Sequence, residues 1–138
     1  MTGLTLILQT RALDRIHYAL MLAATSAALG ASTTLFFAIE GVAALIPDAL
    51  TGKAPQILAT AAGESGEAFL GRLETAGAAA PEELIAALAE LEARFAVCDT
   101  GLAVAGLTLA ELRQDIPLDL TGLTEILAAG KDMRLVYV

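Results

Sequence analysis

The chain has 138 residues, of which 57% are hydrophobic and 17% charged, and its formal net charge is −8. A chain this apolar is not intrinsically disordered, and its length suits a single domain over residues 1–138. The acidic balance, with no basic cluster interleaved with aromatic residues, excludes binding to nucleic acid.

One apolar segment is long enough to span a bilayer. Between Ala19 and Ile46 the only charged residue is Glu40, but the character of the segment changes at Gly30, from alanine-rich and helix-forming to β-branched and aromatic. No aromatic belt or flanking basic cluster supports insertion. We therefore expect a helix, a glycine and a strand here, and no stable insertion into a membrane.

The first half of the chain begins with a β-α-β pattern. Residues 4–8 (LTLIL) form a short apolar run typical of a buried parallel strand. A helix with apolar residues at three- and four-residue spacing follows and ends at Gly30, and residues 33–39 (TTLFFAI) form a second strand. A short helical stretch over 42–46 is expected to stop at Pro47.

The segment from Pro47 to Pro81 has a weaker signal, because it contains five glycines and several alanines. We expect an irregular segment with short helices at about 55–61 and 66–74. Such a segment is typical of a loop or of a contact between subunits.

The second half again alternates. Pro81 opens a helix with acidic residues in its first turn, and a strand is expected over 94–98, followed by a helix over 102–105 that ends at Gly106. The spacing of residues 108–111 (TLAE) predicts a capping box. Thr121 is the expected cap of a helix through residue 129, before a last strand over 133–138. This alternation predicts an α/β sandwich with a mostly parallel sheet of four to five strands.

Cys98 is the candidate catalytic residue. Sites in open parallel sheets form at the carboxyl ends of strands, here after Leu8, Ile39 and Val97, and only the third position carries a thiol. A helix N-terminus stabilises a thiolate, although the neighbouring carboxylate of Asp99 opposes a second negative charge. The alternative is that Cys98 is a small buried apolar residue.

Other chemistry has little support in the sequence. His17 is the only histidine, so zinc-ligand spacing is absent and no metal is expected. A Cys98–His17 pair requires both residues at one end of the sheet; otherwise His17 is a polar residue of the first helix. The phosphate-loop and dinucleotide motifs are missing, so no cofactor is predicted.

A single cysteine excludes an intramolecular disulfide. Together with the absence of a signal-peptide pattern in MTGLTLILQT, it indicates a reducing cytoplasm.

Two segments carry a family resemblance. The second expected strand runs into Glu40-Gly41-Val42, and residues 95–107 (FAVCDTGLAVAGL) place the cysteine before an acid, small residues and a Gly-Leu pair. Both resemble the DsrE/DsrF family, which includes the TusD-type sulfur-relay subunits. The resemblance implies a flavodoxin-like three-layer α/β/α sandwich that forms homo-oligomers, with Cys98 as the residue that carries persulfide sulfur. We take as candidate binding residues Glu40, Gly41, Asp99, Thr100 and Gly101.

Three functions remain open. The first is a sulfur carrier or sulfurtransferase-like protein, with Cys98 accepting sulfane sulfur from a donor protein and passing it to an acceptor protein. The second is a non-catalytic oligomeric binding or assembly module with a structural cysteine. The third is a peroxide-sensing thiol protein. With no second cysteine in the chain, a partner or a small thiol must complete any transfer.

Overall fold

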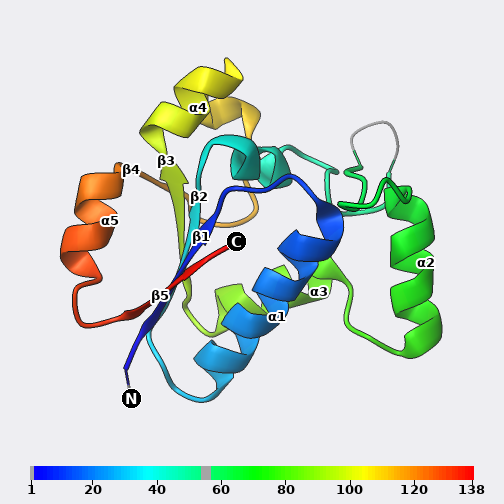
Figure 1. Ribbon diagram of the computed structural model, residues 1–138, viewed down its shortest axis with the longest axis horizontal. Helices are drawn as coiled ribbons and strands as arrows, with labels where there is room; N and C mark the ends of the chain where they lie inside the picture. Colours follow the sequence, from blue (N-terminus) through cyan, green and yellow to red (C-terminus); the bar gives the residue numbers. More distant parts are fainter. Residues whose placement is uncertain (1, 54–56) are drawn as a thin grey trace.

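The computed structural model describes residues 2–53 and 57–138, whose centre is one parallel β-sheet (Figure 1). Five strands lie in the order β4-β3-β2-β1-β5, and every neighbouring pair is parallel. Their bounds are β1 Leu4–Leu8, β2 Thr33–Phe37, β3 Arg94–Cys98, β4 Asp119–Thr121 and β5 Arg134–Tyr137. The predicted α/β flavodoxin-like fold is confirmed.

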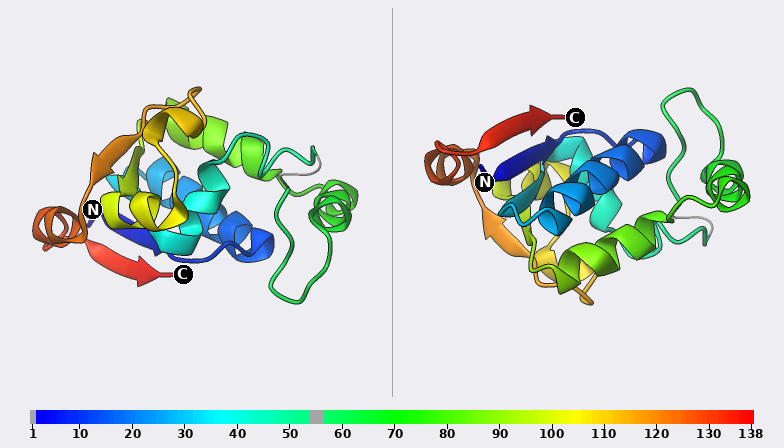
Figure 2. Two further views of the ribbon diagram at one scale, coloured as in Figure 1. Left: turned by 90° about the horizontal axis from the view of Figure 1, so that it is seen from above. Right: turned by 90° about the horizontal axis from the view of Figure 1, so that it is seen from below.

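Helices cover the two faces of the sheet unequally. Helices α1 (Leu13–Ala28) and α3 (Pro81–Glu90) lie on one face, and α5 (Leu123–Ala129) lies on the other (Figures 1 and 2). A right-handed crossover places its helix according to the direction in which the chain moves across the sheet. The chain moves one way from β1 to β4 and returns past β1 only to form β5, so a single short helix covers the second face.

The core follows this asymmetry. The main cluster fills the space between the sheet and the helices α1 and α3, and Leu6, Leu35 and Val97 within it are fully buried. The side chains that alternate with these point to the second face, and with Ile126 of α5 they form a much smaller cluster: Phe36, Ala38, Ala96 and Cys98. The second face is therefore the one with room beside the sheet.

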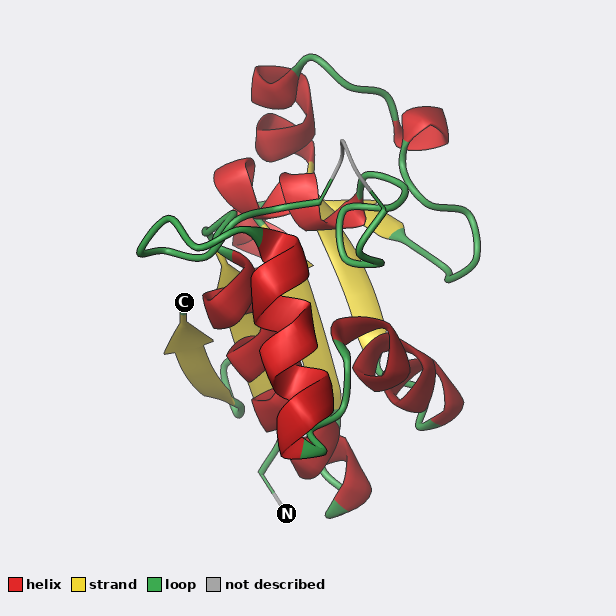
Figure 3. Ribbon diagram, turned by 90° about the vertical axis from the view of Figure 1, so that its right-hand side faces the viewer, coloured by secondary structure: helices red, strands yellow, loops and turns green. Residues whose placement is uncertain are grey.

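After residue 57 the chain leads into α2 (Gly66–Ala76), which lies outside the layer formed by α1 and α3 (Figures 1 and 3). The buried side chain of His17 contacts this segment: its Nε2 lies 2.8 Å from the carbonyl oxygen of Ala79, and its ring forms a T-shaped contact with the ring of Phe69. Arg72 stacks over the same phenyl ring. The predicted helix at 66–74 is confirmed; residues 57–61 are not helical, and Pro55 lies outside the described residues.

Several expected boundaries were wrong for local reasons. The second strand ends at Phe37 and not at residue 39, because Ile39 has φ of 38° and opens a 3-10 helix, η1 (Ile39–Leu45). Helix α4 (Asp99–Ala105) starts directly after β3, three residues before the expected start. Thr121 ends strand β4, which the sequence did not indicate, and Gly122 is the cap of α5.

Other expectations hold. The capping box at Thr108–Glu111 is present and opens the 3-10 turn η2 (Leu109–Glu111). Gly30, just past the end of α1, has φ of 91°, a conformation that glycine adopts without steric cost. The long apolar segment is therefore divided between α1 and β2, and no helix of the described chain has the length and hydropathy needed to cross a membrane.

One ion-pair network ties the loop after η2 to the main helical layer. The side chain of Arg113 is only 11% exposed and donates hydrogen bonds to both carboxylate oxygens of Glu82, at 2.9 and 2.8 Å, and of Asp115, at 2.8 and 2.6 Å. The hydrogen bonds from Arg113 lower the pKa of the Asp115 carboxyl below its usual value.

We expect Arg113→Met to reduce the free energy of unfolding by about 2 kcal/mol at neutral pH, because it leaves the partly buried carboxylate of Glu82 unpaired. Asp115 has a lower pKa folded than unfolded, so its contribution is present at neutral pH and is lost as the pH falls below about 4. Below that pH, the difference in the free energy of unfolding between the wild type and Arg113→Met should become smaller, which urea titrations at several pH values would measure. As a control, Arg94→Met removes an exposed pair with Asp119 and should cost under about 1 kcal/mol.

Candidate functional site

Cys98 is the last residue of β3 and also the N-cap of α4, so the strand-to-helix turn holds it on both sides. Its Sγ accepts a hydrogen bond from the backbone N–H of Gly101 at 3.3 Å. A sulfur atom that accepts a backbone N–H hydrogen bond at the start of a helix is a feature expected of a reactive cysteine. The side chain is only 7% exposed, as expected of a structural cysteine. Cys98 therefore combines the burial of a structural cysteine with the hydrogen bond expected of a reactive one.

Gly101 allows α4 to approach η1 closely. A Cβ at this position would collide with the backbone nitrogen of Ile39. Ile39 itself has φ of 38°, a conformation that costs a β-branched residue about 1–3 kcal/mol and that is frequent at functional sites. The close approach of these two backbones holds the turn that carries Cys98.

A cleft of about 510 Å³ opens beside the thiol, on the second face of the sheet. Its residues come from the strand ends, α4, η1, α5 and β5: Ile7, Gln9, Phe36, Ala38, Ile39, Cys98, Thr100, Leu123, Leu127, Leu135 and Tyr137. Eight of the lining side chains are aliphatic or aromatic, and none of those described is charged. Clefts of this size and lining are typical of sites for small molecules.

The other residues predicted for the site have different positions. Thr100 lines the cleft, and Asp99 accepts a hydrogen bond from the backbone N–H of Thr100 at 2.7 Å while its carboxylate lies beside Gly122. Gly41 is a packing glycine, because a Cβ there would collide with the carbonyl group of Leu8. Glu40 is exposed and lies 3.5 Å from Arg11, outside the residues that line the cleft.

His17 does not assist Cys98. It lies on α1, which covers the first face of the sheet, and its Nε2 contacts the carbonyl of Ala79. Cys98 points to the second face. A Cys98–His17 pair is therefore not formed. Within residues 2–53 and 57–138, no group of three His, Cys, Asp or Glu side chains is placed to hold a metal ion.

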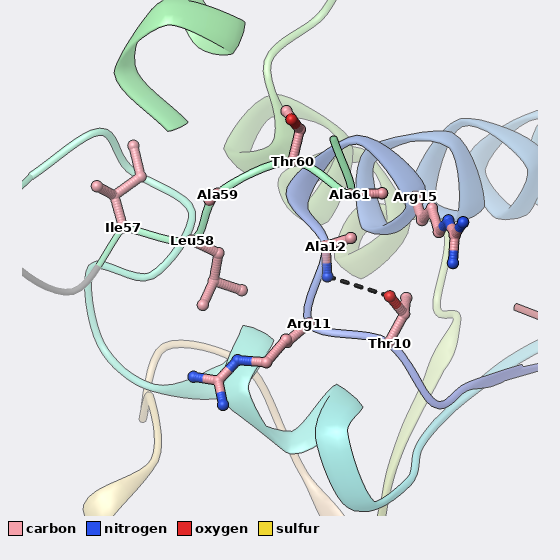
Figure 4. Close-up of a pocket in the computed structure, with 9 residues that line it drawn as sticks. All are labelled: Thr10, Arg11, Ala12, Arg15, Ile57, Leu58, Ala59, Thr60 and Ala61. Carbon is pink, nitrogen blue, oxygen red and sulfur yellow. Dashed lines mark hydrogen bonds between the residues drawn. The ribbon is translucent and has the colours of Figure 1, made fainter. Parts of the chain in front are cut away.

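A second cavity, of about 520 Å³, lies at the carboxyl end of β1 beside the start of α1 (Figure 4). It contains Arg11 and Arg15, but the two guanidinium groups point away from each other. They do not converge on a common position for an anion. Of the three strand ends considered, the end of β3 alone carries a thiol, and it opens into an apolar cleft.

Comparisons with known proteins show the fold and little more. No family model matches the chain, and no curated protein matches its sequence. The fold is that of a solved protein. The crystal structure of the ychN protein from E. coli aligns over 100% of both chains with a TM-score of 0.61 and 12% sequence identity. At that identity the likeness to the ychN protein establishes architecture and leaves function to be argued from the site.

Sequence reasoning missed the walls of the cleft. Leu123 and Leu127 lie four residues apart on one side of α5, and Leu135 and Tyr137 lie two residues apart on one side of β5; all four are about half exposed or more. Their spacing could have shown that each pair shares a face. It could not have shown that the two faces border Cys98.

We expect Gly101→Ala to lower the free energy of unfolding by about 1–3 kcal/mol, because the methyl group would collide with the backbone of Ile39. The loss would occur although alanine has the higher helix propensity. Gly71→Ala is a matched control, since Gly71 lies within α2 and a Cβ there meets no atom within 4 Å; that change should add up to about 1 kcal/mol. Denaturant titrations followed by circular dichroism would measure both, and equal effects would contradict the packing role of Gly101.

Proposed function

We propose that the protein is a sulfur carrier in which Cys98 accepts a sulfane sulfur from a donor persulfide and passes it to an acceptor thiol. The observation that carries the proposal is the position of the Cys98 sulfur, which accepts a hydrogen bond from Gly101 and borders an open cleft at the carboxyl end of β3. The resemblance of residues 95–107 to the cysteine segment of the DsrE/DsrF family supports it.

The reaction balances without a cofactor. The Cys98 thiolate attacks the outer sulfur of the donor persulfide, the S–S bond of the donor breaks, and the donor leaves as a thiolate. An acceptor thiolate then takes the outer sulfur from Cys98 by the same step. Because the chain contains no second cysteine, it cannot release the sulfur by forming an internal disulfide. We therefore propose donor and acceptor proteins as partners, in a reducing compartment such as the cytoplasm.

The hydrogen bond from Gly101 explains how the thiol is held ready. It occupies one lone pair of Sγ and fixes the side-chain rotamer. The Asp99 carboxylate, adjacent in sequence, accepts a hydrogen bond from Thr100 and lies beside Gly122 at the start of α5. The Asp99 carboxylate is thus held by the first turn of α4 and lies at the start of α5.

Cys98→Ser separates the chemistry from the structure. Serine is a preferred N-cap and its hydroxyl can accept the Gly101 hydrogen bond, so stability should change by under about 1 kcal/mol. Incubation with a persulfide donor should add one sulfur atom to the wild type and none to the variant, as intact-protein mass spectrometry would show. A variant that loads sulfur as well as the wild type would refute the proposal.

The second candidate is a non-catalytic oligomeric module in which the cysteine is structural. The 7% exposure of Cys98 and its packing with Phe36, Ala96 and Ile126 favour it. In that case the thiol of the native protein would resist alkylation until denaturant is added. A peroxide sensor would differ again, because Cys98 would take one oxygen atom from peroxide to form a sulfenic acid and would not transfer sulfur.

A further inference from the structure

The cleft beside Cys98 has a chemical character that sulfur carriage does not require. Its described lining offers a carboxamide, a hydroxyl, a phenol and the thiol as polar groups, from Gln9, Thr100, Tyr137 and Cys98, and otherwise only hydrocarbon. Most residues of this protein that carry charge are acidic, yet none of them borders the cleft. An ion placed there would lose hydration without gaining a counter-charge.

The topology makes the cleft concave. The return connection from β4 to β5 crosses the sheet with a helix of seven residues, α5, which is about 10 Å long. Its Ile126 packs on the sheet, whereas Leu123 and Leu127 face the cleft. The exposed edge strand β5 and the ends of α4 and η1 complete the walls, so the space is bounded on several sides and is not a flat apolar face.

The position also suits a ligand. Ligands of open parallel sheets bind outside the carboxyl ends of strands where the strand order reverses. Here the order reverses at β1, which lies between β2 and β5, and the cleft contains Ile7 of β1 and Tyr137 of β5. These two residues are register partners in the sheet.

From these observations we infer that the Cys98 cleft is a binding site for an uncharged, largely apolar small molecule with one or two hydrogen-bonding atoms. It follows that neutral reactants reach Cys98 in preference to anionic ones of the same reactivity. The binding itself does not depend on sulfur transfer. The inference therefore stands or falls separately from the proposed function.

A neutral apolar fluorophore, Nile red, and an anionic one, anilinonaphthalene sulfonate, would test the binding site. We expect Nile red to bind the wild type, and the anionic dye to bind it more weakly. Leu127→Lys, in the cleft wall, should weaken Nile red binding at least about tenfold by placing a charge beside it. The matched control is Leu91→Lys, because Leu91 is 46% exposed and Leu127 47%, both near the end of a helix, and Leu91 does not line the cleft.

Equal effects of the two lysine variants, or tighter binding of the anionic dye to the wild type, would overturn the inference. So would coverage of the cleft by a second copy of the chain. In that case sedimentation would show an oligomer that does not bind Nile red, and Leu127→Lys, but not Leu91→Lys, would convert it to monomers.

A pair of disulfide reagents would test access to the thiol. The Cys98 thiolate attacks the disulfide of either reagent, a mixed disulfide forms, and an aromatic thiolate leaves. With rates normalised to those of a small free thiol, neutral dithiodipyridine should react at least about tenfold faster than dianionic dithiobis(nitrobenzoate). Equal normalised rates would contradict the selectivity. A protein that shows the selectivity but does not load sulfur would refute the sulfur-carrier function alone.

Discussion

The right-handedness of crossovers between parallel strands determines which side of this protein is available for function. Because β1, β2 and β3 follow one another across the sheet, the helices α1 and α3 that connect them lie on one face and build the main core there. The one reversed connection leaves the second face with a single seven-residue helix. The cleft beside Cys98 is the space that this arrangement leaves uncovered, and it needs no special insertion to form.

A close contact between two backbones fixes the turn that carries Cys98. Gly101 allows α4 to begin immediately after β3, and the left-handed conformation of Ile39 turns the chain away at the end of β2. Together they hold the ends of two adjacent strands so that Cys98 and Ala38 share one face. A bulkier residue at 101 would move α4 away from η1 and, with it, the N–H group that meets the sulfur.

The sequence predicted the elements that depend on local pattern. The buried strands β1 and β3 and the helices α1 and α3 have apolar periods long enough to identify, and Gly30 marks the end of α1. Strand β4 was missed because Asp119–Thr121 is three residues long, contains an acid and lies at the sheet edge, where only pairing with β3 defines it. The cleft depends on long-range packing between α5 and β5, which no local pattern encodes.

The burial of Cys98 and its proposed reactivity are compatible because of the cleft. A side chain that is 7% exposed presents little surface to bulk water, but the space it borders is large enough for a reactant. A persulfide would extend the side chain by one S–S bond, about 2 Å, and the direction open to the added sulfur is the cleft. The outer sulfur would then lie in the cleft, whose described side chains are mostly hydrocarbon. The same apolar walls that select a neutral reactant would thus surround the sulfur that Cys98 carries, and the open side of the cleft is where an acceptor thiol would enter.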